Sequence, residues 1–314
     1  MRLSGDFIVS PHGSRAPQSL RIGGGGTVVA SFGRGVLVES GSEFLHCSLK
    51  NRKLRIVCGD RVAWSDSLKD GGPAIESVEP RRNVVERIDA RGRAEPVAAN
   101  IDRLAIVIAR EPEPDWFLAD RYWAGARLKD LDALLIVNKS DLSADSMRGE
   151  LESYRALGLA CCEVSALTGR GIEELQGALA AGTTLVVGQS GVGKSSLVNA
   201  LAPQAAAETQ ELTRDVEGRH TTTTARRYRL APDAALMDAP GVRDFAPPAS
   251  LVRAAERGFV EIHRSSADCR FNDCRHMQEP GCAVRAAVLA GLIAPRRYES
   301  YRRLFRLYEK LAPD

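Results

Sequence analysis

Two short segments of the chain contain the residue types that bind a nucleotide, and the first holds phosphates. Residues 188–195 read Gly-Gln-Ser-Gly-Val-Gly-Lys-Ser. In such a loop backbone N–H groups cradle the phosphates and the lysine reaches the terminal ones. The Ser195 hydroxyl is a magnesium ligand, because positioning catalysis acts on a chelated, charge-neutralised triphosphate. The predicted phosphate-site residues are Gly188, Gln189, Ser190, Gly191, Val192, Gly193, Lys194, Ser195 and Ser196.

The second segment, at residues 138–141, reads Asn-Lys-Ser-Asp and comes before the loop in the chain. Asp141 is expected to select the base, since a carboxylate can accept two hydrogen bonds from the donor edge of guanine and cannot accept two from adenine. The predicted nucleotide is therefore GTP. Ordinary GTPases have the phosphate loop first, so this order indicates circular permutation. The predicted base-site residues are Asn138, Lys139, Ser140, Asp141, Ser165 and Ala166.

Downstream of the loop lie candidates for the two nucleotide-sensing switch segments. Asp238 ends a short apolar run and starts the segment Asp-Ala-Pro-Gly. It is expected to hold magnesium through a water molecule, with the amide of Gly241 near the γ-phosphate. Residues 220–224 read His-Thr-Thr-Thr-Thr. Either Thr222 or Thr223 is expected to sense magnesium and the γ-phosphate, and the sequence leaves both open.

The residue after the second switch motif is Val242, where many GTPases have a glutamine that positions water. An apolar side chain cannot orient water, so intrinsic hydrolysis is expected to be slow until another group or a partner completes the site. His220 is one candidate, because an imidazole can position or deprotonate water near neutral pH. The alternative is a histidine that only hydrogen-bonds the switch backbone.

A third group of chemically active residues has the spacing C-x4-C-x-H-x5-C in a polar segment. Its members are Cys269, Cys274, His276 and Cys282. Three thiolates and one imidazole complete a tetrahedral zinc site, so the zinc is expected to be structural and to supply folding energy. The alternative is unligated surface cysteines beside a chance histidine. The cysteines in apolar, strand-like contexts are predicted to be core residues: Cys47, Cys58, Cys161 and Cys162.

The elements that position these groups divide the chain into three predicted domains. Residues 1–95 contain five short strand-like runs, which suit an OB-like β-barrel. Residues 96–248 have an α/β pattern that places the nucleotide motifs at the carboxyl ends of strands, where open sheets bind ligands. Residues 249–314 are predicted to be helical around the zinc cluster. The expected barrel strands are 27–31, 35–38, 43–47, 61–64 and 74–78, with turns at 23–26 and 71–72; the helices are Leu251 to Ile262 and two more from Ala283 and Arg296.

Composition restricts the class of protein further. The 314 residues are 44% hydrophobic, which supports packed cores, and seven cysteines are unsuited to a fully paired disulfide framework. No apolar stretch approaches the roughly 20 residues that span a bilayer. The first residues have no signal-peptide pattern, so no membrane partner is expected and the expected location is the cytoplasm.

The net charge of +3 is unevenly distributed. Residues 1–95 carry 15 basic against 11 acidic side chains, 96–248 carry 16 against 21, and 249–314 carry 12 against 8. The last predicted helix by itself fits an amphipathic helix with solvated arginines and core aromatics. Together with a basic barrel and a zinc module, it predicts nucleic-acid binding. Its basic and aromatic residues are Arg296, Arg297, Tyr298, Tyr301, Arg302, Arg303, Phe305, Arg306, Tyr308 and Lys310.

These motifs, in this order, resemble those of the bacterial ribosome small subunit-dependent GTPase A family, also called RsgA or YjeQ. The resemblance covers nearly the whole chain and is most specific at 188–196, 218–223 and the zinc cluster; the amino-terminal region matches only in architecture. Ala239 departs from the hydroxyl residue that is common there. The resemblance implies a monomeric GTPase with one zinc ion that binds the small ribosomal subunit and its ribosomal RNA, acts late in maturation of the subunit and is stimulated by it.

The expected cycle starts when GTP orders both switches, and the ordered form then docks on the small subunit. Docking completes the hydrolysis site, and GDP triggers release. Three alternatives are open. One is a permuted GTPase that assembles the large subunit, against which the carboxyl-terminal zinc cluster argues. Another is a GTP-regulated RNA-binding module with incidental hydrolysis, and the third is an ATPase or small-molecule kinase, against which Asp141 argues.

Overall fold

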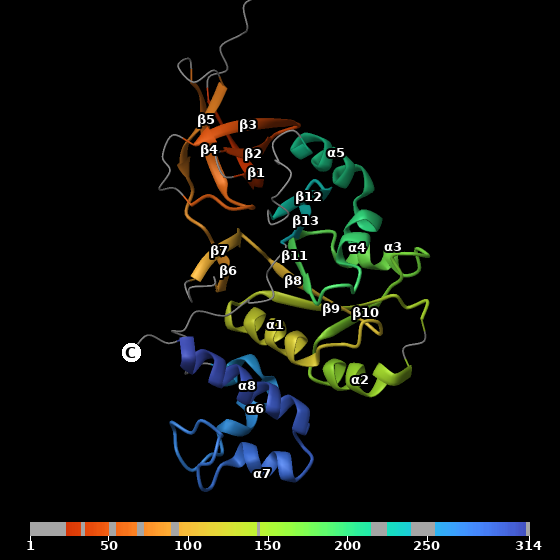
Figure 1. Cartoon of the computed structure of the whole chain (residues 1–314). Helices are drawn as coiled ribbons and strands as arrows, with labels where there is room; N and C mark the ends of the chain where they lie inside the picture. Colours follow the sequence, from red (N-terminus) through yellow and green to blue (C-terminus); the bar gives the residue numbers. More distant parts are fainter. Residues whose placement is uncertain are drawn as a thin grey trace, which may run out of the picture.

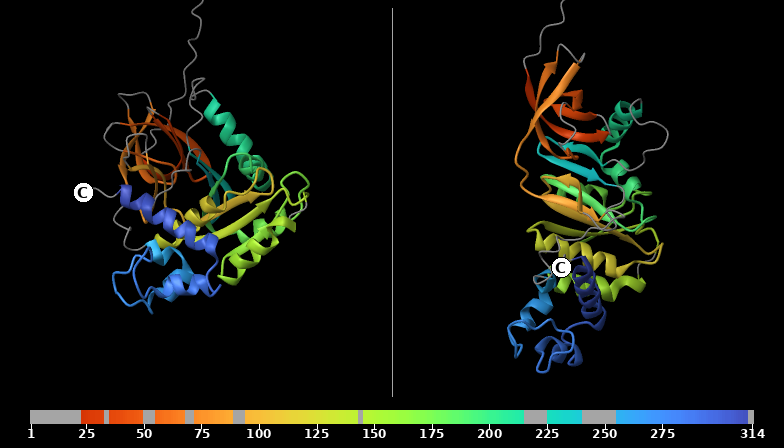
Figure 2. Two further views of the ribbon diagram at one scale, coloured as in Figure 1. Left: turned by 60° about the horizontal axis from the view of Figure 1, so that its bottom comes forward. Right: turned by 60° about the vertical axis from the view of Figure 1, so that its left-hand side comes forward.

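The computed structural model describes residues 23–32, 35–49, 55–67, 72–88, 94–142, 145–214, 225–239 and 255–311. These form an amino-terminal barrel, a central α/β layer and a carboxyl-terminal helical unit (Figure 1). The barrel and the helical unit lie at opposite ends of the central layer, as the right-hand view of Figure 2 also shows. Within the described part of the chain, no helix combines the length and apolarity needed to cross a membrane.

The barrel has the five strands that the sequence predicts. They are β1 (Gly24–Phe32), β2 (Gly35–Ser40), β3 (Glu43–Leu49), β4 (Arg61–Ser67) and β5 (Gly72–Val78). They follow the order β1-β2-β3-β5-β4, and pairing of β1 with β4 closes the barrel. Apolar residues that alternate along these strands fill its interior, among them Val28, Val38 and Trp64.

The predicted turn at residues 23–26 is wrong for Gly24–Gly26, which begin β1 and pair with β4. A Cβ atom on Gly26 would lie 2.5 Å from Val38 Cγ1, and one on Gly24 would lie 3.0 Å from the Trp64 ring. The glycines are therefore needed for close packing between strands, not for a change of direction. Gly72 likewise begins β5, and Gly71 lies outside the described residues.

The central sheet has the order β10-β9-β8-β11-β13-β12, parallel except for the β12–β13 hairpin. Its four inner strands, β9, β8, β11 and β13, are mostly buried apolar runs, as expected for a sheet covered on both faces, whereas β10 and β12 are partly exposed. Helices α1 and α2 pack on one face, and α3 and α4 on the other. The elements are β8 (Arg103–Ala109), α1 (Trp116–Leu128), β9 (Asp132–Asn138), η1 (Asp145–Met147), α2 (Arg148–Ala156), β10 (Ala160–Glu163), α3 (Ile172–Ala178), β11 (Gly182–Gly188), α4 (Lys194–Leu201), α5 (Pro203–Arg214), β12 (Arg226–Ala231) and β13 (Ala234–Asp238).

The barrel and the central sheet are continuous, because β1 of the barrel pairs with β12. The connection along the chain contains a separate hairpin, β6 (Val84–Ile88) and β7 (Ala94–Ala99). The sequence pattern predicts no strands at these positions, and the proposed domain boundary at residue 95 lies within β7.

The carboxyl-terminal unit contains α6 (Val260–Ser266), α7 (Ala283–Leu289) and α8 (Pro295–Leu311). The helix predicted over residues 251–262 is wrong for residues 255–259. Residues 255–258 form a 3-10 turn, Phe259 is extended, and α6 begins only at Val260. The cause is packing: a Cβ on Gly258 would lie 2.8 Å from Ala124 Cβ of α1, and Phe259 is buried. Residues 251–254 lie outside the described part.

The aromatic residues of α8 pack in the core of this unit, as an amphipathic helix predicts. Tyr301, Phe305 and Tyr308 are buried. The prediction of an RNA-facing basic surface is wrong for two arginines of this helix. Arg297 is buried against Asp120 of α1 and Glu261 of α6, and Arg296 is also paired with Asp120. These two guanidiniums join the helical unit to the central layer.

Candidate nucleotide site and metal centre

The phosphate loop lies where the sequence predicts, between β11, which ends at Gly188, and α4, which begins at Lys194. Its glycines fit where side chains do not. Gly188 and Gly193 have positive φ, and a Cβ on them would collide with the Val107 carbonyl oxygen and the Asn138 amide, respectively. The loop is therefore packed against β8 and against the end of β9, which holds part of the predicted base site.

The Lys194 ammonium is held at the loop. Its Nζ atom donates hydrogen bonds to the carbonyl oxygens of Gly188, at 3.0 Å, and Gln189, at 2.7 Å. These two hydrogen bonds orient the ammonium beside the backbone of the loop. The adjacent Ser195 and Ser196 lie in the first turn of α4, whose amino end favours negative charge.

Base-site and phosphate-loop residues are directly hydrogen-bonded. Asn138 Nδ2 donates to the carbonyl of Val192 at 2.9 Å, and Lys139 Nζ donates to the carbonyl of Gly191 at 2.8 Å. The Ala166 amide donates to Asn138 Oδ1 at 3.1 Å. Three segments far apart in the sequence thus meet at one edge of the sheet, as predicted.

Asp141, the predicted base selector, is oriented by Ser165. The Ser165 hydroxyl donates to Asp141 Oδ1 at 2.5 Å and accepts from the Thr168 amide at 3.2 Å. The Ser140 amide donates to the carbonyl of Val164 at 3.0 Å, which fixes the backbone of the same segment. A carboxylate held in this way can present its acceptors in one direction, as recognition of a flat base requires.

Gln189 has a contact that sequence reasoning missed. Its side chain belongs to the loop before α1: Nε2 donates to the carbonyl of Glu113, and Oε1 accepts from the Asp115 amide, both at 3.0 Å. Asp115 in turn caps α1 through the Leu118 amide. The side chain of Gln189 therefore anchors the phosphate loop, and nothing in the spacing of residues 111–115 identifies their segment as a partner.

Asp238 ends β13 beside the phosphate-loop strand, opposite Val186 of β11. Burial raises the pKa of this carboxyl above its usual value, while the charges of Lys194 and Arg226 act in the opposite direction. Asp238 therefore lies close enough to Lys194 of the phosphate loop for the two charges to interact. The other predicted switch residues lie outside the described part of the chain: His220, Thr222, Thr223 and Gly241.

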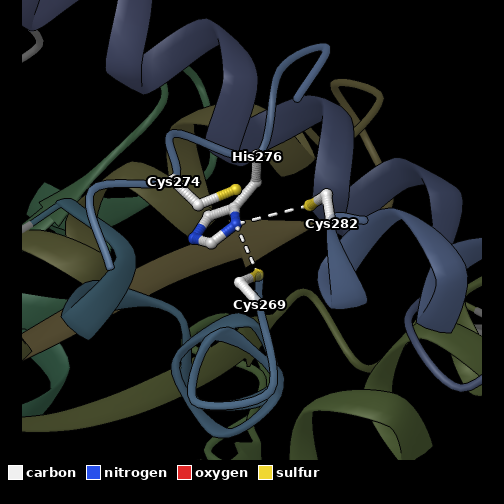
Figure 3. A group of neighbouring side chains, drawn as sticks. All are labelled: Cys269, Cys274, His276 and Cys282. Atoms are coloured by element: carbon white, nitrogen blue, oxygen red, sulfur yellow. Dashed lines mark hydrogen bonds between the residues drawn. The ribbon is translucent and has the colours of Figure 1, made fainter. Parts of the chain in front are cut away.

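The four predicted zinc ligands gather in one place (Figure 3). The potential ligand atoms of Cys269, Cys274, His276 and Cys282 all lie within 4.8 Å of one another. His276 Nδ1 is 3.5 Å from the sulfur atoms of both Cys269 and Cys282. Their donor chemistry and compactness suit a closed tetrahedral zinc site.

Glu256 and α8 support this cluster. His276 Nε2 is 2.9 Å from Glu256 Oε2, so donation to the carboxylate leaves Nδ1 as the atom that faces the sulfurs. Tyr298 and Tyr301 donate to the carbonyls of His276 and Arg275 at 2.5 and 2.9 Å. Sequence reasoning missed Glu256, because it lies 20 residues before His276 in no ligand-like pattern.

Burial makes thiolates costly within the cluster and in the barrel. It raises the pKa of the Cys274 thiol to about 12, so a bound cation is the natural means of keeping this sulfur ionised. Burial also raises the pKa of Cys58 to about 12. Cys58 and Cys47 are buried core residues, as predicted, whereas Cys161 and Cys162 are half-buried against the central cores. In the described residues none of these four joins a group of potential ligands.

Comparisons with known proteins find similar sequences over most of the chain. The family model described as RsgA GTPase matches residues 78–247. A protein of Azotobacter vinelandii, named small ribosomal subunit biogenesis GTPase RsgA, is 42% identical over a 291-residue alignment that covers 89% of this chain and 84% of that protein. A protein of the same name from Pseudomonas aeruginosa is 42% identical over 285 residues, with the same coverage.

Two solved structures resemble the whole chain. YjeQ from Thermotoga maritima has a TM-score of 0.71 and 30% identity, covering 93% of this chain and 100% of that one. YloQ, described as a circularly permuted GTPase, has a TM-score of 0.67 over 96% of this chain and 100% of that one. At 22% identity, YloQ supports the fold alone.

Proposed function

Because this chain belongs to the RsgA GTPase family, we propose that its GTP hydrolysis serves late maturation of the small ribosomal subunit, which stimulates it. The observation that carries the proposal is the direct bonding of the base-site residues Asn138 and Lys139 to the phosphate loop, in a chain 42% identical to small-subunit biogenesis GTPases over 89% of its length. A preassembled site favours GTP binding as an integral activity of the protein.

The described residues suggest a division of labour at the nucleotide. Asp141, oriented by Ser165, selects guanine, while the loop amides and Lys194 bind the phosphates. Ser195 and Asp238 are the proposed magnesium ligands, the latter through water. Magnesium neutralises the charge that develops on the phosphates. Thr222 or Thr223, with the amide of Gly241, is proposed to sense the γ-phosphate.

Hydrolysis is proposed to be slow until the subunit completes the site. Val242 cannot orient water, so either His220 or a group from the subunit must do so. This gives the partner control over the chemical step. The subunit must prefer the GTP form over the GDP form, since only a difference in affinity lets hydrolysis time the release.

The cysteine and histidine cluster is proposed to hold one structural zinc. All four ligand positions come from the protein, with Glu256 behind His276. No coordination position is left for a substrate, so the metal would stabilise the loops between α6 and α8.

Ribosomal RNA, a monomeric state and a cytoplasmic location are parts of the same proposal. The net positive charge of the flanking domains supports contact with phosphates. Because Arg296 and Arg297 are committed to internal pairs, RNA contacts on the helical unit must use other basic residues. Its exposed arginines include Arg264, Arg270, Arg285 and Arg306.

GTP turnover measured alone, with purified small subunits and with purified large subunits tests the proposal. Turnover should rise about tenfold or more with the small subunit only, since a partner can supply a missing catalytic group. Lys194→Ala should abolish it. Equal responses to both subunits, or to neither, would contradict the proposed partner. If Lys194→Ala retained full activity in subunit maturation, hydrolysis would be incidental and the protein would act as an RNA-binding module.

A further inference from the structure

One row of paired residues crosses the sheet from the barrel to the proposed magnesium ligand. Ala30 of β1 pairs with Arg226 of β12, Arg226 pairs with Asp238 of β13, and Asp238 pairs with Val186 of β11. The row therefore contains the pair by which the barrel joins the central sheet. The barrel meets this sheet at the level of Asp238.

The β12–β13 hairpin of this row is flanked by the two predicted switch segments. Residues 220–224, the first predicted switch, lie just before β12 in the chain, and Asp238 at the end of β13 begins the second. Strand β12 is the edge of the central sheet, and β1 of the barrel covers it (Figures 1 and 2). An edge strand without such a partner would present unpaired N–H and C=O groups and shift more easily.

Glu39 of β2 holds this edge. It is only 8% exposed and lies between two arginines of β12: its Oε2 atom is 2.5 Å from Arg227 Nη1, and its Oε1 atom is 2.9 Å from Arg229 Nε. Alternate residues of a strand point to the same face, so one carboxylate can bind both. A buried carboxylate requires such partners, because its charge is costly without them.

A second contact reaches β13 from the barrel. Gly59 precedes β4, and its amide donates to the carbonyl of Val28 in β1 at 2.8 Å. A Cβ on Gly59 would lie 2.5 Å from the Met237 methyl group, one residue before Asp238. The barrel thus holds both strands of the hairpin, β12 through Glu39 and β13 through this close approach.

We propose that Glu39 is a positioning residue for GTP hydrolysis. By fixing β12 to the barrel it sets the place of the hairpin, and so of the Asp238 carboxylate, relative to the phosphate loop. A ligand that binds the barrel and shifts this junction would change magnesium binding without touching the nucleotide. The inference rests on the proposed role of Asp238 at magnesium and extends it to a residue of another domain.

Magnesium titration of GTP turnover, together with GDP affinity measured in EDTA, tests this role. Glu39→Gln should raise the magnesium concentration for half-maximal turnover about threefold to tenfold. Its GDP affinity without magnesium should stay unchanged, because Asp141 and the phosphate loop are intact. Glu39→Asp, which keeps the charge, should recover part of the loss. Glu95→Gln is the matched control, since it breaks a glutamate–arginine pair with Arg87 in the β6–β7 hairpin.

The outcomes separate this inference from the proposed function. If Asp238→Asn leaves the magnesium requirement unchanged, the proposed magnesium ligand is wrong. If Asp238→Asn raises the magnesium requirement while Glu39→Gln has the same requirement as the control Glu95→Gln, Glu39 has no positioning role. A parallel loss of magnesium-free GDP affinity in Glu39→Gln would mean general destabilisation and would also overturn the inference. Should Glu39→Gln fail to fold, Arg229→Gln can be measured in its place, because it breaks one of the two ion pairs of Glu39 at a half-exposed side chain. It should raise the magnesium requirement in the same direction, by a smaller factor.

Discussion

At the scale of single residues, the nucleotide site is organised by side chains that bind two parts of it at once. Lys139 donates to the carbonyls of both Gly191 and Glu111. Lys194 donates to two carbonyls of the phosphate loop to which it belongs. Ser165 orients Asp141 with one hydrogen bond. The free-energy cost of ordering these groups is met during folding, so GTP meets a site that needs little further rearrangement in its described part.

Asp141→Asn should change the base specificity. The amide replaces one acceptor with a donor, so it opposes the donor edge of guanine and suits the additional oxygen of xanthine. GTP affinity should fall by at least about a hundredfold, and XTP should compete better than GTP. Displacement of a fluorescent nucleotide measures both. Asp132→Asn, at an exposed carboxylate on the same sheet, should leave both affinities unchanged.

As the pH falls, magnesium binding should begin to weaken at a higher pH than it would if the metal ligand had the pKa of an ordinary aspartate. Burial raises the pKa of Asp238 above its usual 3.8, and the protonated carboxyl binds no cation. As pH falls, the magnesium concentration for half-maximal turnover should therefore rise before the usual aspartate range is reached. Magnesium competes with the proton, so saturating magnesium should reduce the loss. Magnesium titrations at a series of pH values measure this change. The Asp238→Asn variant should lack the pH dependence. If the variant and the unaltered protein had identical pH profiles, Asp238 would be excluded as the source of the dependence.

At the scale of elements, the segment between α6 and α7 is held by its ligand set and by neighbouring helices. The cluster brings four side chains of a short polar loop together, while Glu256 and the hydroxyls of Tyr298 and Tyr301 hold it from outside. Turns at Gly281 and His276, both with positive φ, direct the ligands inward. This short loop is expected to depend on the proposed zinc for its stability.

Glu256→Gln should lower zinc affinity about 10- to 100-fold, because the partner that orients the imidazole is weakened. Competition with a coloured chelator, read together with thermal unfolding of the full chain, measures the effect. Glu299→Gln removes a carboxylate that binds the exposed arginines of α8 and serves as the control. Equal zinc affinity in both variants would show that Glu256 does not support the site.

At the scale of the whole molecule, a buried ionic group joins the helical unit to the central layer. Asp120 of α1 is fully buried and accepts hydrogen bonds from Arg296 at 2.7 Å, Arg297 at 2.6 Å and the Tyr154 hydroxyl at 2.5 Å. Arg297 also donates a hydrogen bond to Glu261 of α6. Together with the β1–β12 junction at the other end, this group ties the central layer to both flanking units.

Asp120→Asn should destabilise the protein by about 3 kcal/mol, because it leaves the buried Arg297 without one of its two carboxylates. Denaturant unfolding of the full chain measures the change. Glu163→Gln breaks the exposed pair with Arg155 and should cost less than about 1 kcal/mol. Similar free energies of unfolding for the two variants would contradict the structural importance of the buried group.

The chemistry of the candidate sites could be predicted from residue types and spacing along the chain. The phosphate loop, the base-site tetrapeptide and the zinc ligands are predicted from residue type and spacing, and the apolar runs before the two nucleotide motifs predict the strands β11 and β9 that end at them. The strands of the barrel followed from short alternating runs in the same way. These signals are local, because a loop that wraps a phosphate or a metal must be built from neighbouring residues.

The contacts between distant segments could not be predicted in this way and became visible in the folded chain. Glu256 behind His276, Gln189 at the entry to α1, Glu39 on β12 and Asp120 beneath Arg297 all lie far in sequence from their partners. The same holds for the end of the predicted helix at Phe259 and for Gly24–Gly26 in a strand, where close packing overrode local preference. Long-range contacts are set by how the elements pack, and no spacing along the chain records that packing.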